Sequence, residues 1–196
     1  LSEWLALGWL TPAMDRLFSE GPSARRQFID RMVLALEPGH AKHAARMQAA
    51  LRERHRLLGE MDDPDPAWFD AIEAQIAEAG ALVAQARARL ITALSERLAL
   101  LPEAPFARPD LTYVPGGPLD AAEFAATLAA TRRRDRAALR TLTGPHRDEL
   151  RVTMAGKRQP ASTCSTGEQK ALLIAITLAH ADLLQDSRPA LLLLDE

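Results

Sequence analysis

The chain has 196 residues with 24 basic and 26 acidic side chains and a formal net charge of −2, and hydrophobic residues make up 47% of it. This composition supports a sizeable core in one or two small domains and excludes a chain that is disordered throughout. No apolar run reaches the roughly 20 residues of a membrane-spanning helix, and the first residues lack the pattern of a signal peptide. The single cysteine, Cys164, can form neither an internal disulfide nor a zinc site. We therefore expect a cytoplasmic protein that does not engage a membrane.

The first part of the chain mixes short apolar and polar stretches. Residues 4–10 form an apolar start, and Thr11-Pro12 is typical of a helix N-cap with proline in the first turn. Gly21-Pro22 breaks the chain before residues 23–36, whose apolar positions recur at helical spacing. The chain starts with leucine and ends at Glu196 directly after an apolar run, so we expect a fragment of a longer protein.

The middle of the chain predicts two long helices, over residues 40–61 and 67–101, joined by a turn that contains Pro64 and Pro66. Apolar residues in both helices recur every three or four positions. Two such helices joined by a short turn pack antiparallel, as a helical hairpin or a short coiled-coil arm. Two ordinary helices of a helical subdomain are the alternative.

The last part of the chain alternates strands and helices. Asp120 and Glu123 have the spacing of a capping box, which predicts that a helix starts there. Residues 150–160 predict a strand and part of a hairpin, and the continuous apolar character of residues 191–194 predicts a buried strand. The predicted elements are a strand over 111–114, a helix over 121–140, a strand over 150–154, a helix over 168–185 and a strand over 191–194.

The most informative stretch begins the helix predicted over residues 168–185. Ser165 and Glu168 have capping-box spacing, and Gly167 lets a backbone or a ligand approach closely. Free amides and a serine hydroxyl at a helix N-terminus form an anion site that suits phosphate. An ordinary helix cap has the same pattern, so this feature alone decides nothing.

Asp195 and Glu196 follow the apolar strand over 191–194, which is the Walker B arrangement. The first acid would hold Mg²⁺, which prefers oxygen ligands, and the second would orient and deprotonate the attacking water. A strand followed by an acidic turn is the simpler alternative. The cap, the apolar helix and the acidic strand end together form a more specific set than any of them alone.

This set resembles the ABC-type ATPases, in which a Ser-Gly-Gly-Gln signature precedes a helix and Walker B follows. The stretch Ser165 to Gln169 matches this signature, with Thr166 in place of the first glycine and Glu168 inserted before the glutamine. The resemblance implies that the cofactor ATP is sandwiched between two heads, with Ser165 and the Gly167 amide on the γ-phosphate bound by the partner subunit. It implies an α/β fold: a partial ATPase head, similar to P-loop NTPases, with a mainly helical lobe that contains the antiparallel hairpin.

Two further segments resemble the RecF family of recombination mediators. Residues 142–150 are similar to its Gly-Pro-His-Arg-Asp segment, and residues 21–30 to its Gly-x-Pro-x-x-Arg-Arg-x-Phe-Leu-Asp segment with one residue fewer between Gly and Pro. The resemblance implies that residues 1–37 lead from the head into the helical lobe, that 38–101 form the hairpin lobe, and that 102–196 return to the head with the signature and Walker B. Walker A, the D-loop and the switch histidine are absent from this sequence, so we expect no ATPase activity from these residues alone.

For the full-length protein, the resemblance implies an ATP-dependent homodimer that binds DNA at single-strand gaps and stalled forks. Its implied partners are RecO and RecR, and through them RecA, in recombinational repair and the SOS response. The alternatives are another ABC-type ATPase, SMC-like or nuclease-associated, and a helical interaction module without enzymatic activity.

Two arginine clusters are candidates for DNA contact. One lies on the predicted 40–61 helix and includes Arg52 and Arg56, and the other comprises Arg132, Arg133, Arg134, Arg136 and Arg140. Such clusters bind phosphates in a salt-dependent manner that ignores base sequence. A solvated helix face with ion pairs between successive turns is the alternative. Residues 60–78 are acidic, so we expect the tip of the hairpin to face a protein partner rather than DNA.

Overall fold

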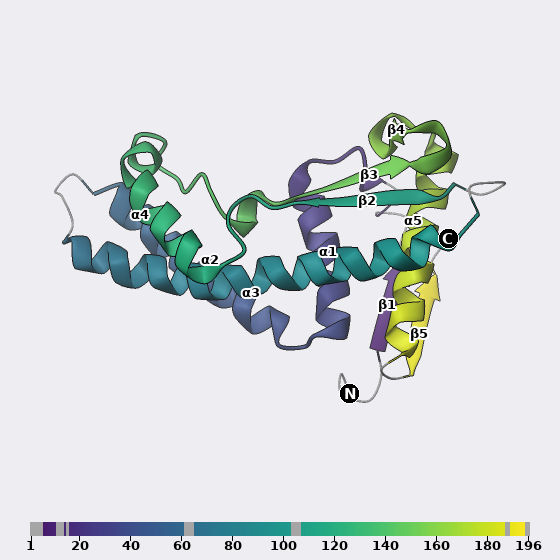
Figure 1. The fold of residues 1–196 in the computed structure, drawn as a ribbon, viewed down its shortest axis with the longest axis horizontal. Helices are drawn as coiled ribbons and strands as arrows, with labels where there is room; N and C mark the ends of the chain where they lie inside the picture. Colours follow the sequence, from purple (N-terminus) through teal and green to yellow (C-terminus); the bar gives the residue numbers. More distant parts are fainter. Residues whose placement is uncertain are drawn as a thin grey trace. The chain divides into compact units, whose positions relative to one another are not determined.

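The computed structural model describes residues 6–10, 14, 16–60, 65–102, 107–186 and 189–194. The chain separates into two compact units, drawn in Figure 1. The sheet unit comprises Leu1–Pro38, Arg87–Val114 and Glu149–Glu196, and the helical unit comprises Gly39–Ala86 and Pro115–Asp148. The division at residues 37 and 101 that the sequence suggested stays a prediction.

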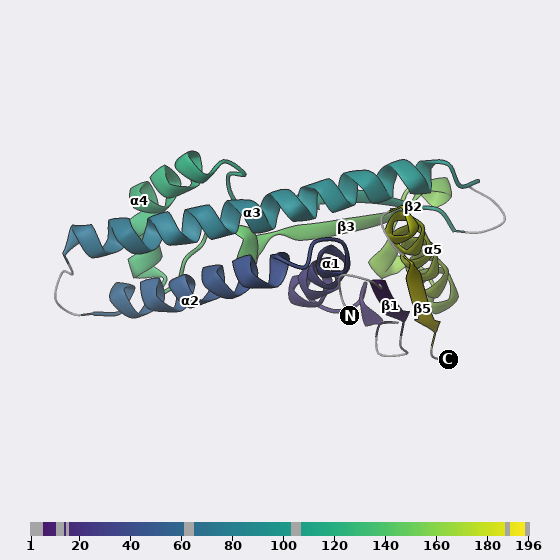
Figure 2. The ribbon, with the colours of Figure 1, turned by 90° about the horizontal axis from the view of Figure 1, so that it is seen from below.

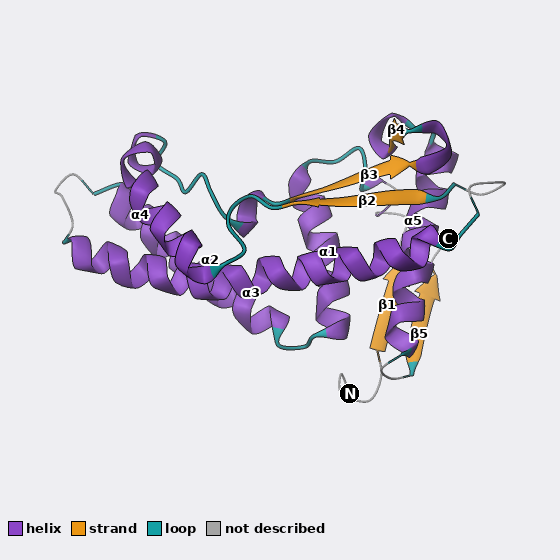
Figure 3. Ribbon diagram, viewed as in Figure 1, coloured by secondary structure: helices purple, strands orange, loops and turns teal. Residues whose placement is uncertain are grey.

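Mixed helix and sheet structure confirms the predicted α/β class (Figure 3). The predicted helices and strands are present, with ends that shift by a few residues, and Thr11-Pro12 lies outside the described residues. The elements are β1 (Ala6–Leu10), α1 (Pro22–Leu36), α2 (His40–Leu58), α3 (Pro66–Ala99), β2 (Pro109–Val114), α4 (Ala121–Ala137), β3 (Glu149–Met154), β4 (Gln159–Pro160), α5 (Thr166–Gln185) and β5 (Ala190–Leu194).

The helical unit is built on an antiparallel hairpin of α2 and the first part of α3, which Figure 2 shows side by side. Close to their connection, Leu57 and Leu58 of α2 pack against Phe69 of α3. Farther from it, Met47 of α2 lies in the same buried cluster as Val83 of α3. Early residues of one helix therefore meet late residues of the other, which confirms the predicted hairpin.

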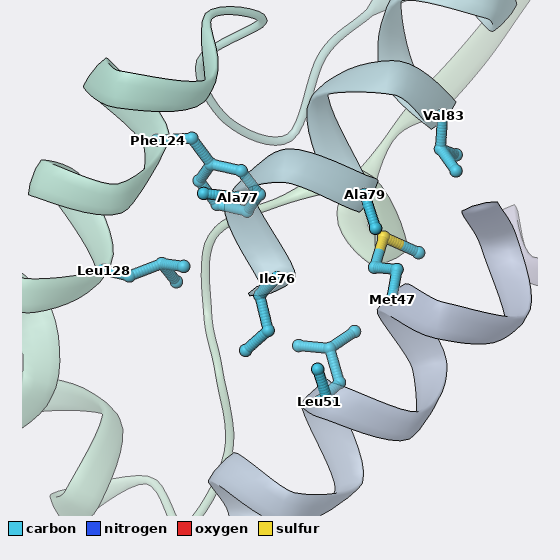
Figure 4. Packing of buried hydrophobic residues seen from close by; sticks show 9 residues of the cluster. Met47, Leu51, Ile76, Ala77, Ala79, Val83, Phe124 and Leu128 are labelled. Carbon is cyan, nitrogen blue, oxygen red and sulfur yellow. The ribbon is translucent and has the colours of Figure 1, made fainter. Parts of the chain in front are cut away.

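Helix α4 closes the core of the helical unit (Figure 4). Asp120 caps its N-terminus by accepting a hydrogen bond from the amide of Glu123 at 2.9 Å. Phe124 and Leu128 point from α4 into the cluster of α2 and α3 and are fully buried. Gly80 makes this packing possible, because a Cβ at that position would lie 2.8 Å from the Phe124 ring.

A buried arginine crosses this apolar core. Arg54 interrupts the apolar pattern of α2 and is 0% exposed. Its guanidinium donates to Glu73 of α3 at 2.9 Å and to Asp135 of α4 at 2.8 Å. It also donates to the Thr141 hydroxyl at 2.8 Å and to the Leu128 carbonyl at 3.0 Å. Arg54 therefore links α2, α3 and α4 inside the core. It does not contribute to the basic surface of α2, as its charge alone would suggest.

The sheet unit contains two separate sheets. β1 pairs in parallel with β5, with Ala6 opposite Ala190 and Leu10 opposite Leu194. β2, β3 and β4 form an antiparallel sheet in that order, which confirms the predicted hairpin after residue 150. Helices α1 and α5 pack on β1, and α1 also packs on β3.

Two features of the parallel pair differ from expectation. The apolar start of the chain forms the strand β1, although its pattern predicted no particular element. Leu191 and Leu193 of β5 are 47% and 50% exposed, so the prediction of a buried strand is wrong at these positions. Parallel strands are normally covered on both faces, whereas these two leucines of β5 keep about half of their surface exposed among the described residues. Among the described residues, no helix is long and apolar enough to cross a membrane.

Candidate functional site

The N-terminus of α5 carries the complete capping box that the sequence predicted. Ser165 has an extended backbone, and its hydroxyl accepts a hydrogen bond from the Glu168 amide. In return, the Glu168 carboxylate accepts from the Ser165 amide at 2.8 Å and from the Ser165 hydroxyl at 2.9 Å. The reciprocal bonds satisfy helix amides that would otherwise lack partners and hold the serine in one orientation.

A lysine outside the predicted motif completes this group. Lys157, in the turn after β3, forms an ion pair with Glu168. Hydrogen bonding from Lys157, followed by that from the Ser165 amide and hydroxyl, lowers the pKa of Glu168 to about 2. The same bond raises the pKa of Lys157. Sequence reasoning missed this lysine because no motif links a residue in a turn to a helix start farther along the chain.

The pKa of Glu168 provides a direct check on this geometry. We expect its carboxyl to titrate at about 2, below its ordinary value of 4.5, in a carbon-detected NMR titration. Because the folded-state pKa is depressed, the interaction stabilises the fold above pH 4.5 and this contribution is lost as the pH falls through about 2. The Lys157→Gln variant should raise this pKa but leave it below 4.5, because the bonds from Ser165 remain. A wild-type value of 4.5 would contradict the described contacts.

The signature residues are accessible from outside the chain. Ser165, Thr166 and Gly167 are exposed, and a Cβ built on Gly167 would meet no heavy atom within 4 Å. The helix that they begin is 20 residues long, so its amide dipoles favour an anion at this end. A phosphate approaching from another molecule would meet the Ser165 hydroxyl and the first amides of α5 without displacing any packed side chain.

Cys164, directly before the signature, is a packing residue. It is buried, and burial raises the pKa of its thiol above the ordinary value. The Gln169 side chain donates to the Cys164 carbonyl at 2.9 Å and ties the loop to the helix. A protonated, buried thiol is a weak nucleophile, so we assign Cys164 a packing role and no role in catalysis.

The predicted Walker B acids, Asp195 and Glu196, lie outside the described residues. The last described residue of β5, Leu194, is paired with Leu10 of the parallel strand β1. The two acids therefore follow the carboxyl end of a parallel strand, where α/β proteins commonly place ligand-binding residues. Among the described residues, no cluster of histidine, cysteine or acidic side chains could hold a metal ion.

The structure separates the arginines that the sequence grouped as DNA candidates. Arg132 pairs with Glu73 and Asp70, and the hydrogen bond that it donates to Glu73 raises the pKa of its guanidinium. Arg56 is exposed and pairs with Glu53 and Glu60 along α2. Arg52, Arg133 and Arg134 are exposed, and Arg136 is half-buried.

The acids near the hairpin tip have partners of their own. Arg54 and Arg132 both bind Glu73, which is 2% exposed, and Arg46 binds Glu78 at 2.9 Å. Much of the predicted acidic surface is thus neutralised inside the helical unit. The expectation that this tip faces a protein partner has no support from these contacts.

Comparison with solved structures defines the class of protein. Two structures of the recombination mediator protein RecF in the RecFOR pathway, RecF-ATPrS and RecF-ATP, match with TM-scores of 0.82 and 0.81. The matches cover 98% and 97% of this chain and 55% and 54% of those chains, at 19% sequence identity. No protein-family model matches the sequence. The fold is that of about half of these RecF structures.

Sequence relatives define the family. The DNA replication and repair protein RecF of Mesorhizobium japonicum is 48% identical over 211 residues, which cover 99% of this chain and 54% of the relative. The chain belongs to the RecF family and spans about half the length of the curated relatives it matches. The resemblance to the RecF family drawn from residues 21–30 and 142–150 is confirmed, and the alternative of another ABC-type ATPase, SMC-like or nuclease-associated, is set aside.

Proposed function

We propose that the full-length protein is an ATP-dependent, dimerising DNA-binding ATPase of recombinational repair, and that this chain supplies its signature and Walker B. Its proposed sites of action are single-strand gaps and stalled replication forks in the cytoplasm, where it would help RecO and RecR to load RecA and contribute to the SOS response. Family membership supports this role. A structurally similar RecF is described as RecF-ATP in the RecFOR pathway, which supports ATP as the cofactor.

The observation that carries the proposal is the exposed capping box at the start of α5. Ser165 is held in one orientation, and the amides of Thr166 and Gly167 stand at the positive end of a long helix. The chain contains no G-x-x-x-x-G-K-[ST] loop to cradle phosphates. A γ-phosphate held by another subunit can reach Ser165, and this explains why ATP would join two heads. For that contact the Ser165 hydroxyl would turn its single proton from the Glu168 carboxylate to a phosphate oxygen.

Asp195 and Glu196 would perform the chemistry at the end of β5. Asp195 offers the carboxylate oxygen that Mg²⁺ prefers, and the ion would neutralise charge on the phosphates when bound. Glu196 would orient the attacking water and accept its proton. Both roles need the phosphate-binding segment that this chain does not contain, so these 196 residues alone should not hydrolyse ATP.

The Ser165→Ala variant of the full-length protein tests the contact between subunits. Losing a hydrogen bond to a charged phosphate costs roughly 1.5–3 kcal/mol, and a symmetric dimer makes this contact twice, so we expect ATP-dependent dimerisation to weaken on the order of a hundredfold to ten-thousandfold. ATP binding to the monomer should be unchanged, because the serine acts on nucleotide held by the other subunit. Analytical ultracentrifugation with and without ATP measures the first effect, and fluorescent-nucleotide titration measures the second.

Ser162→Ala is the matched control, since Ser162 is exposed in the turn before the signature. It should dimerise like the wild type. Because Ser165→Ala also removes the N-cap of α5, the melting temperature of this variant is measured to separate a loss of stability from a loss of dimerisation. Wild-type dimerisation by Ser165→Ala would remove the signature from the ATP interface.

A further inference from the structure

The segment from residue 132 to residue 147 carries six arginines and a single aspartate, Asp135. That aspartate is 0% exposed and is bound by Arg54 inside the helical unit, so it does not offset the surface charge. Arg132 is neutralised by Glu73 and Asp70 of α3. Four exposed arginines are left, and we refer to them as the arginine edge: Arg133, Arg134, Arg140 and Arg147.

These four guanidinium groups have no acidic partner among the described residues. The bond that Arg134 makes is to the neutral hydroxyl of Thr143, at 3.1 Å. By contrast, the exposed arginines Arg46 and Arg56 of the same unit are both paired with acids. The arginine edge is therefore a local excess of positive charge within a chain whose net charge is −2. Such an excess favours binding of an anion at this place.

The contacts of the loop after α4 fix the backbone around two members of the arginine edge, Arg134 and Arg147. The bond from Arg134 to Thr143 places the end of α4 beside the turn Pro145–Arg147. The amide of Arg147 donates to the Gly144 carbonyl at 2.8 Å, which folds Arg147 back towards the same loop. Gly144 allows this turn because its φ of 130° is a conformation that other residues rarely adopt.

The buried network below the loop holds it in place. Arg54 donates to the Thr141 hydroxyl at 2.8 Å, and His55 Nε2 accepts from the Thr141 amide at 3.0 Å. Asp135 accepts from the Leu142 amide at 3.2 Å. The backbone that carries Arg140 and Arg147 is thus ordered before any ligand arrives. Preorganisation of this kind lowers the entropic cost of binding.

The residue types select the anion. Guanidinium groups bind phosphate in planar, bidentate geometry, and a row of them follows a nucleic-acid backbone. Binding of single strands normally adds aromatic side chains on which bases stack. In the described part of the helical unit, Phe69 and Phe124 are buried, and the exposed Trp68 belongs to α3, outside the segment 132–147 that carries the arginine edge. The arginine edge therefore fits backbone phosphates and offers nothing for bases to stack on.

We propose that the arginine edge binds the phosphate backbone of duplex nucleic acid, and that Arg132 and Arg56 do not take part. The proposal rests on the proposed DNA-binding function and assigns the contact to particular residues. It adds Arg147 to the arginine clusters that the sequence suggested. It also explains the buried Arg54 network, which keeps two acids away from this surface and fixes the loop that presents it.

A pair of double variants of the full-length protein tests the proposal. Arg134→Gln/Arg147→Gln removes two charges from the arginine edge, and Arg46→Gln/Arg56→Gln removes two charges from exposed, paired positions of the same unit. Affinity for a labelled duplex is measured by fluorescence anisotropy over a series of salt concentrations, with ATP present. We expect the edge variant to bind on the order of ten- to a hundredfold more weakly and its salt slope to fall by about 2, because about 0.9 counterions are released per phosphate contact. The control variant should keep the wild-type slope.

Other outcomes separate the two proposals. If the wild type does not bind the duplex, the proposed function itself fails. If the wild type binds and both variants lose affinity equally, net charge and not the arginine edge is responsible, and the inference is overturned while the function stands. Unchanged binding by the edge variant, or loss of single-strand binding alone, overturns it in the same way. Circular dichroism of each variant checks that the fold is retained.

Discussion

Replacing Arg54 by methionine should destabilise the helical unit by about 3–5 kcal/mol, the usual cost of breaking a buried ion pair by removing one partner. The substitution leaves Asp135 buried at 0% exposure with only hydroxyl and amide donors near its carboxylate. Glu73 keeps Arg132, so Asp135 should account for most of the cost. Native-state hydrogen exchange of the α2 and α4 amides in the full-length protein measures the effect where it arises.

Two further variants separate this effect from a general loss of charge. Arg56→Met lies two residues along the same helix and removes an exposed arginine, so it should leave hydrogen exchange unchanged. Arg54→Met combined with Asp135→Asn should cost less than the sum of the single changes, with a coupling of about 1–3 kcal/mol, because the uncompensated charge is gone. Equal effects of Arg54→Met and Arg56→Met would show that the buried network contributes nothing.

The Glu196→Gln change in the full-length protein should lower the rate of ATP hydrolysis at least about a hundredfold, the usual contribution of a general base. Glutamine keeps the size of the side chain but cannot accept the proton of the attacking water. ATP binding and ATP-dependent dimerisation should persist, so the dimer accumulates instead of being released. Phosphate release and size-exclusion chromatography with ATP measure the two effects.

Asp182→Asn is the control for Glu196→Gln. Asp182 is an exposed acid of α5 that pairs with Arg97, and in the sequence it comes before β5 rather than after its end. Its loss should leave hydrolysis at the wild-type rate. Hydrolysis at the wild-type rate by Glu196→Gln would mean that another group activates the water.

Local sequence patterns were sufficient for most elements of this fold. Apolar residues at helical spacing predicted α2 and α3, and the two prolines between them predicted the hairpin. The Ser165–Glu168 spacing predicted the capping box at α5, which the structure confirms atom by atom. These features depend on residues within a few positions of each other, so the chain specifies them locally.

Strand β1 could not be predicted in the same way. Its five residues have no distinctive period, and its partner β5 lies at the other end of the chain. Pairing between distant segments depends on the whole fold, because neither strand forms a sheet alone. The exposed leucines of β5 were missed for the same reason, since the apolar run does not say which neighbours cover it.

The same distinction between local patterns and contacts of distant segments applies to the candidate sites. The sequence by itself determined the family and predicted a signature at Ser165 and Walker B acids after β5, because these are contiguous motifs. Tertiary structure alone decided which charges remain available: Arg54 is buried against Asp135, Arg132 is paired with Glu73, and Arg134 and Arg147 are exposed with no acidic partner in the described part of the chain. The physical reason is that the free energy of a charge depends on its burial and on partners brought close by folding, and neither is recorded in a run of arginines.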